Sequence, residues 1–197
     1  MKISFVKSIE PILRQCKTPA LEVGANMRYM INDAKVAESI FSTGFHTCSG
    51  FDINAGKMNL VGHIKPEGFN SRNFAEAFER LVKGFQDKYG EVKALVLGGR
   101  EVAFCDPYSD VTSNEVYATM CNVLSTKCNI SDEKFVSILG KFKDVKTNDD
   151  IAIIGDRVFV ANKEFEKAGV LNSTKSNIED NLTNVYEDVI IPSEFLA

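Results

Sequence analysis

Residues 45–64 read FHTCSGFDINAGKMNLVGHI, and this stretch decides how the rest of the chain is interpreted. It contains both histidines of the chain, His46 and His63, and one of its five cysteines, Cys48. Two strand-like segments flank Ala55-Gly56, and a two-residue turn at that point predicts a β-hairpin. In this register Cys48 lies directly opposite His63.

This register predicts a Cys/His pair. Directly opposed side chains on antiparallel strands point to the same face, with Cβ atoms about 4.5–5.5 Å apart. A free thiol has a pKa of about 8.5 and is mostly protonated at neutral pH, and a neighbouring imidazole can take its proton. We therefore expect Cys48 as a nucleophile and His63 as its base, with His46 on the Cys48 face as the rival base. The structural alternative is that Cys48 is a small buried hydrophobe and that the histidines only support the fold.

Composition excludes several classes of protein. The 197 residues are 44% hydrophobic and include 14 Phe, which suits one well-packed domain. A net charge of −4 offers no broad basic face for nucleic acid. The cysteines show neither CxxC pairs nor metal-ligand spacing, so we expect no metal site and no cofactor. No apolar run approaches the ~20 residues of a membrane span, so we expect a chain made in the cytoplasm without a signal peptide and without membrane insertion.

The hydrophobic pattern predicts an alternation of strands and helices. The clearest element is an amphipathic helix from Ser71 to Gly90, followed by a buried strand at 93–97. The further expected elements are a strand-like region at 27–43, a helix with a capping box opening at Thr112, a short helix at 131–142, a hairpin at 151–162 turning at Gly155-Asp156, and a helix within 163–197.

This order favours an α+β fold, an α/β sandwich in which a mixed β-sheet is covered by two to three helices. We expect one domain over residues 1–162. Residues 163–197 form a C-terminal extension, expected to be helical, that docks on the domain or on a partner protein.

The segment TGFHTCSGFDINAGKMNLVGHI, residues 43–64, resembles the nucleophile segment of the CheD chemoreceptor glutamine deamidases. The order of elements continues to match through a loop with Pro66, a helix, a strand ending in Gly98-Gly99, a further helix and a closing hairpin. The resemblance covers roughly residues 27–162. A similar Cys/His arrangement occurs in bacterial deamidase toxins of the cytotoxic necrotising factor class.

The resemblance implies a CheD-like sandwich and a role for each site residue. Cys48 and His63 are the catalytic pair, and Ser42 takes the place of a family Thr whose hydroxyl orients the imidazole. Backbone N–H groups near Thr47 and Ser49 would hold the oxyanion. The family usually has Gly-Ser before the cysteine, whereas this chain has His46-Thr47, so the pocket mouth and the substrate are expected to differ.

The implied activity is that of a cysteine-dependent hydrolase, which converts a protein glutamine to glutamate through a thioester. Its partner is a protein substrate, and the divergence favours an effector or toxin, secreted into another cell without a cleavable signal peptide. With an amine as acceptor the same pair makes a transglutaminase, and with a backbone amide as substrate it makes a cysteine peptidase. A non-catalytic protein-binding module that retains the fold is the alternative from another class.

Overall fold

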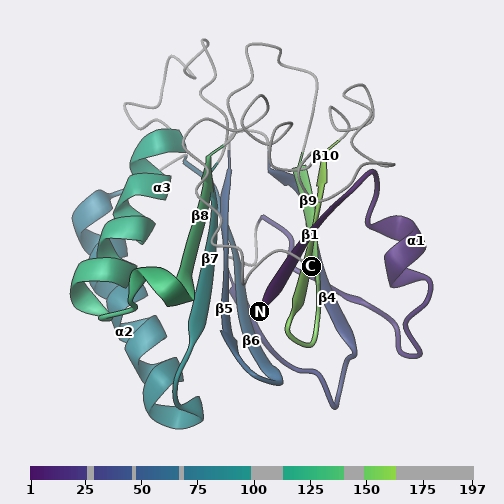
Figure 1. Ribbon diagram of the computed structural model, residues 1–197. Helices are drawn as coiled ribbons and strands as arrows, with labels where there is room; N and C mark the ends of the chain where they lie inside the picture. Colours follow the sequence, from purple (N-terminus) through teal and green to yellow (C-terminus); the bar gives the residue numbers. More distant parts are fainter. Residues whose placement is uncertain (26–28, 46–47, 67–68, 99–112, 140–148, 163–197) are drawn as a thin grey trace.

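The described residues form two five-stranded sheets that pack face to face (Figure 1). The structure, a computed structural model, describes residues 1–25, 29–45, 48–66, 69–98, 113–139 and 149–162. Both sheets are mixed, because each contains antiparallel and parallel strand pairs. The expectation of an α+β fold is confirmed. The expectation of one mixed sheet is wrong, because the strands divide into two sheets with an apolar core between them.

Sheet A has the strand order β1-β10-β9-β4-β2, and sheet B has the order β3-β6-β5-β7-β8. The strands of sheet A are β1 (Lys2–Val6), β10 (Arg157–Asn162), β9 (Asp149–Ile154), β4 (Ser39–Phe45) and β2 (Leu21–Glu22). Those of sheet B are β3 (Tyr29–Asp33), β6 (Met58–Ile64), β5 (Ser49–Ala55), β7 (Lys93–Gly98) and β8 (Phe135–Leu139).

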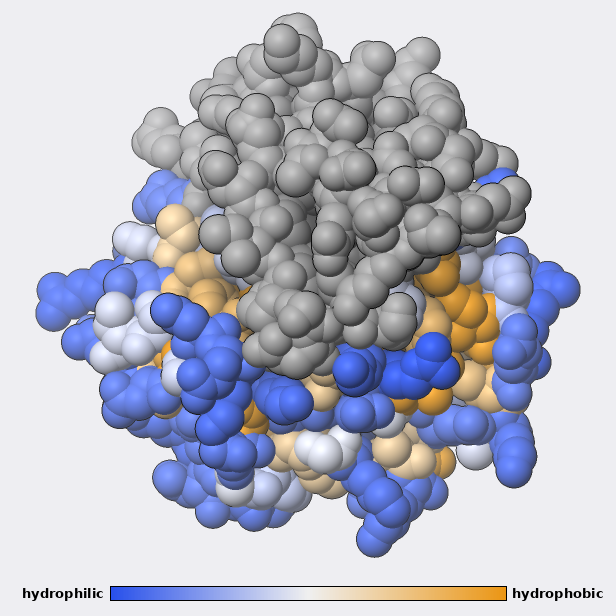
Figure 2. Space-filling view, in the orientation of Figure 1, coloured by the Kyte–Doolittle hydropathy of each residue, from blue (hydrophilic) through white to orange (hydrophobic). Residues whose placement is uncertain are grey.

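Helices cover the outer faces of the two sheets unequally. The outer face of sheet B is covered by α2 (Ser71–Tyr89) and by α3 (Ser113–Asn122), which continues into the π-helical turn η1 (Val123–Lys127) (Figure 1). Among the described residues, the outer face of sheet A carries only the short helix α1 (Glu10–Leu13). Figure 2 shows hydrophilic side chains over most of the described surface in this view, with apolar patches between them.

The helix expected from Ser71 to Gly90 is confirmed as α2. Its apolar positions recur with helical spacing, so Phe78, Val82 and Phe85 are buried against sheet B. The side chain of Asn70 caps the first turn by accepting the backbone N–H of Asn73 at 3.0 Å. The strand expected at 93–97 and the hairpin turning at Gly155-Asp156 are likewise confirmed, as β7 and as β9 with β10.

The β5–β6 hairpin forms, but its register differs from the predicted one. The turn residues are Gly56 and Lys57 rather than Ala55-Gly56, since Ala55 pairs with Met58. Gly56 has φ +67°, a value that a two-residue hairpin turn requires at its first central position and that Ala adopts only with strain. As a result Gly50, and not Cys48, lies opposite His63.

The helix expected at 131–142 is wrong. A short 3₁₀ turn, η2 (Asp132–Lys134), leads directly into β8, which pairs in parallel with β7. The segment FVSIL suits a buried strand, and its partner lies some forty residues earlier in the sequence, so only tertiary pairing identifies it. The capping residue Thr112 and the expected helix within 163–197 lie outside the described residues.

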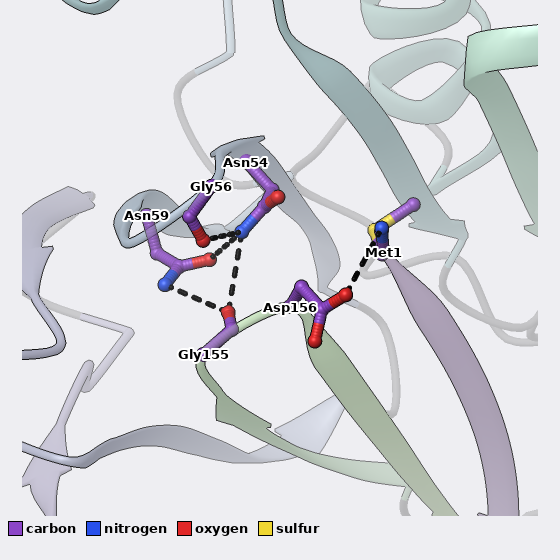
Figure 3. Close-up of polar contacts among 6 residues, drawn as sticks. All are labelled: Met1, Asn54, Gly56, Asn59, Gly155 and Asp156. Atoms are coloured by element: carbon purple, nitrogen blue, oxygen red, sulfur yellow. Dashed lines mark hydrogen bonds and ion pairs between the residues drawn. The ribbon is translucent and has the colours of Figure 1, made fainter.

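The two sheets are joined at the turn end of their hairpins. Asn54 and Asn59 both donate a side-chain N–H to the carbonyl oxygen of Gly155 at 3.2 Å, and Asn54 also donates to the Asn59 side-chain oxygen at 2.8 Å (Figure 3). Nearby, the Met1 nitrogen lies 4.0 Å from Asp156 Oδ2. This polar cluster fixes the β5–β6 turn against the β9–β10 turn. Among the described residues, no helix is long and apolar enough to cross a membrane.

Candidate active site

The candidate site lies between the sheets, at the end of the sandwich away from the polar cluster at Gly155. Ser42 and Phe45 reach it from β4, and His63 reaches it from β6. Cys48 directly precedes β5. All four residues are buried, and Cys48 and Phe45 belong to the same inter-sheet apolar cluster. The fold therefore brings Ser42 and Phe45 into contact with His63, and it places Cys48 in the apolar cluster that contains Phe45.

A β-bulge in β4 directs two residues at His63. Ser42 pairs with Ile151 and Phe45 pairs with Asp149, so β4 contains one more residue than β9 over this interval. Strand alternation alone would send residues 42 and 45 to opposite faces, and the extra residue places both on the inner face. Gly44 permits the bulge with φ +78°, and its N–H donates to Asp150 Oδ1 at 2.9 Å.

The hydrogen bonds of Ser42 determine the tautomer of His63. Ser42 Oγ lies 2.5 Å from the carbonyl oxygen of Val23 and 2.9 Å from His63 Nδ1. A hydroxyl has one hydrogen, and the carbonyl can only accept it, so Ser42 must accept the Nδ1–H of His63. In a neutral imidazole the other nitrogen, Nε2, then carries the lone pair. His63 Nε2 is buried and has no hydrogen-bond partner among the described residues.

The surroundings of His63 keep the imidazole uncharged. The side chain is 2% exposed, and the ring of Phe45 stacks on it with centroids 4.3 Å apart. Burial lowers the pKa of His63 to about 4, and the positive charge of Lys65 acts in the same direction. At neutral pH the imidazole is therefore uncharged and unprotonated at Nε2, which is the form that accepts a proton.

Cys48 is one diagonal step from His63 rather than directly across from it. Gly50 occupies the opposing position, and Cys48 lies two residues before it, on the same inner face. Diagonal neighbours have Cα atoms about 7–8 Å apart, farther than directly opposed residues. Gly50 leaves room for this arrangement, because a Cβ at that position would lie 2.5 Å from Phe45 Cε1. The predicted pairing is thus replaced by a looser one on the same face.

The remaining predicted site residues divide into described and undescribed ones. Ser49 is buried as the first residue of β5. Thr47 and His46 lie outside the described residues. Within the part of the chain that the structure describes, no group of three or more His, Cys, Asp or Glu side chains is placed to hold a metal ion.

Several residues that shape the site were not predicted from the sequence. Phe45 and Gly44 act through stacking and through the bulge, and Asp150 holds the bulge from the neighbouring strand. The GF pair before the cysteine is the signal that could have identified the bulge. Asp52, also unpredicted, is fully buried, and neither of its carboxylate oxygens has a hydrogen-bond partner among the described residues. A charged residue within the predicted hairpin is the feature of the sequence that could have identified Asp52.

Comparison with known proteins adds no assignment to this geometry: no protein-family model matches the chain, and no curated protein matches it.

Proposed function

We propose that this chain is a protein-glutamine deamidase of the CheD-like type, in which Cys48 is the nucleophile, His63 the general base and acid, and Ser42 the residue that orients the imidazole. The observation that carries the proposal is the hydrogen-bond arrangement of His63. Ser42 holds Nδ1–H, which leaves Nε2 as an unprotonated acceptor on the face that Cys48 shares. A deamidase needs this tautomer, since its base must accept the thiol proton.

The proposed reaction begins with a neutral thiol and a neutral imidazole. As the Cys48 sulfur attacks the glutamine carboxamide carbon, His63 Nε2 takes the thiol proton. The resulting imidazolium donates that proton to the nitrogen that leaves as ammonia, and a thioester remains. Water then attacks the thioester, and His63 accepts its proton and returns it to the sulfur. The net change is one carboxamide and one water converted to one carboxylic acid and one ammonia.

The environment of His63 favours proton donation to the leaving nitrogen over removal of the thiol proton, because a low pKa makes the imidazolium a strong acid and the imidazole a weak base. A pKa of about 4 keeps the base unprotonated in the resting state. The imidazolium that forms during the reaction is a strong acid for the same reason, so it readily protonates the leaving nitrogen. The hydrogen bond from Nδ1–H to Ser42 holds the ring in position during both steps.

The test is the mass of partner proteins after incubation with the chain. Deamidation adds about one dalton at a glutamine, because a carboxamide becomes a carboxylate. We expect Cys48→Ser and His63→Ala to abolish this gain, and Cys121→Ser, at a half-buried cysteine packed on the helix side of sheet B, to retain it as the matched control. An unchanged gain with Cys48→Ser would overturn the proposal. Incorporation of an added primary amine would indicate transglutamination instead, and a shortened substrate would indicate peptidase activity.

A further inference from the structure

Among the described residues, the outer edge of β3 has no neighbouring strand. β3 is the first strand of sheet B, and the described residues place only β6 beside it. The N–H of Ala34 donates to the carbonyl of Lys57 at 2.9 Å, in continuation of the β3–β6 register. Because hydrogen-bonded pairs alternate along an antiparallel ladder, Met30 and Asn32 bond to β6, whereas Tyr29 and Ile31 direct their N–H and C=O groups outward.

This edge also carries exposed apolar side chains. Among the described residues, the exposed large hydrophobic side chains are Tyr29 at 48%, Ile31 at 45% and Val36 at 76%. Tyr29 and Ile31 are two residues apart, so they stand on one face of the strand. The strand YMIND contains neither the lysine nor the proline with which many proteins block an open sheet edge. An edge of this kind is suited to pairing with another strand.

We propose that the β3 edge binds an extended segment of the substrate protein by β-strand addition, which anchors the segment beside the active site. This inference rests on the proposed function. Its basis is continuity: Tyr29 lies opposite Gly62, the residue before His63, so the end of β3 is level with the proposed base. On the inner face, Met30 packs against the apolar cluster that contains Cys48.

The small size of the edge favours a transient substrate over a second copy of the chain. β3 has five residues and is therefore about 17 Å long. Its backbone is interrupted at Asp33, whose carbonyl already accepts the N–H groups of Val36 and Ala37. A stable protein dimer usually buries about 1,200–2,000 Å², far more than one short strand pair provides. A few main-chain hydrogen bonds and two apolar contacts match an encounter that must end in product release.

The geometry defines what the segment should look like. Neighbouring strands lie about 4.8 Å apart, so an added strand would run about 10 Å from β6. An extended residue spans about 3.3 Å, so the target glutamine should lie at least about three residues from the anchored positions. Residues that pair with β3 should alternate, with apolar or β-branched side chains facing Tyr29 and Ile31.

The first test is independent of the chemistry. The full chain, labelled with ¹⁵N, is titrated with the capped peptide acetyl-Thr-Val-Thr-Val-Thr-amide, and with the same peptide N-methylated at alternate residues. We expect the first peptide to change the NMR chemical shifts of the backbone amides around Tyr29 and Ile31, and the methylated peptide to leave them unchanged. Shifts elsewhere, or none at millimolar peptide, would overturn the β3 proposal and leave the deamidase proposal standing.

Two variants identify the edge. Ile31→Pro removes an outward N–H that makes no bond to β6, and proline is tolerated on sheet edges. Ile31→Lys places a charge on the apolar contact and serves if the proline variant fails to fold. Both should lose the peptide-induced shifts, whereas Val36→Lys, which adds the same charge on the neighbouring exposed turn, should keep them. If the wild type self-associates and Ile31→Lys makes it monomeric without any peptide binding, the occupant is a second copy and the substrate proposal is wrong.

The second test uses a protein substrate identified by its Cys48-dependent mass gain. Ile31→Lys should raise KM at least about tenfold, because a charge replaces the apolar contact of Ile31 with the bound segment, and kcat should be retained. Val36→Lys should match the wild type. Equal KM values for all three proteins would sink the edge proposal. Absence of any Cys48-dependent mass gain would sink the proposed function, and the peptide titration would then still decide the edge.

Discussion

At the scale of single residues, Ser42 determines which nitrogen of His63 can act as a base. Ser42→Ala removes the acceptor for Nδ1–H, so the imidazole is free to adopt the tautomer with the proton on Nε2. We expect kcat for deamidation to fall at least about tenfold, a small part of what general-base catalysis contributes. Ser42→Thr is the control, because its hydroxyl can accept the same N–H. Equal loss in both variants would mean that packing, and not the hydrogen bond, is what matters.

His63 also gives the protein a stability that depends on pH. Burial holds its pKa at about 4 in the folded protein, against 6.5 for the ordinary group. Below 6.5 the unfolded chain gains a proton that the folded chain lacks, so the free energy of unfolding should fall as pH drops from 6.5 toward 4. Denaturant unfolding of the wild type and of His63→Ala across this range measures the effect. The wild type should lose unfolding free energy relative to His63→Ala as the pH falls from 6.5 toward 4.

Asp52 should act in the opposite direction over a similar range. Burial raises the pKa of its carboxyl to about 7 from the ordinary 3.8, opposed in part by the positive charge of the Met1 amine. The folded state therefore holds a proton that the unfolded state releases, and the free energy of unfolding should fall as pH rises from about 4 to about 7. Asp52→Asn, which is uncharged and similar in shape, should remove this dependence and be more stable than the wild type at pH 8. The comparison is made in the His63→Ala background, so that the titration of His63 does not mask that of Asp52. If His63→Ala with Asp52 intact has the same free energy of unfolding at about pH 4 and at about pH 7, the prediction is contradicted.

At the scale of elements, the bulge in β4 places Ser42 and Phe45 on His63. Gly44→Ala adds a Cβ that meets no atom within 4 Å, so its cost comes from φ +78° alone, about 1–2 kcal/mol of unfolding free energy. Gly56→Ala, in the β5–β6 turn, has the same kind of cost at φ +67° and the same open space, which makes it a matched control. Both variants should lose similar stability, but only Gly44→Ala should alter the pH profile of Cys48 alkylation by iodoacetamide. Equal profiles would show that the bulge does not position the base.

The elements show why sequence reasoning identified some parts of the fold and not others. The α2 helix and the β9–β10 hairpin were predicted because their apolar spacing and turn residues lie within the segment itself. β8 was misread as a helix because only its parallel pairing with β7 identifies it. The β5–β6 hairpin was recognised, but its turn was placed one residue early. That shift moved the predicted partner of His63 from Gly50 to Cys48.

The site itself was partly predictable for the same reason. Cys48 and His63 stood out because reactive side chains are rare in this chain and close together in it. Ser42 followed from the resemblance alone, and its contact with His63 joins strands of different sheets. The effects of Phe45 and Asp150 could not be predicted, because one depends on an irregular strand and the other on a neighbour more than a hundred residues away in sequence.

At the scale of the whole molecule, the two ends of the sandwich differ in how their buried polar groups are hydrogen-bonded. At one end, His63 Nε2 is buried without a hydrogen-bond partner among the described residues, which costs stability, and the proposed mechanism uses this nitrogen as its base. At the other end, Asn54, Asn59 and Gly155 satisfy one another and hold the two sheets together (Figure 3). Four residues of extended strand, about 13 Å, separate Asn59 from His63. Sites this far apart and without shared partners should contribute to stability independently.

This separation leads to a prediction about the Asn cluster. Asn54→Ala and Asn59→Ala should each lower the free energy of unfolding by about 1–3 kcal/mol, because each leaves buried polar groups without their partners. The double variant should cost less than the sum of the two, since both single changes break the bond that joins the pair. Neither variant should change the pH profile of Cys48 alkylation at a temperature where it remains folded. A shifted profile would show instead that the spacing of the sheets, set at the Asn cluster, controls the position of His63, and the two ends would then have to be treated as one coupled unit.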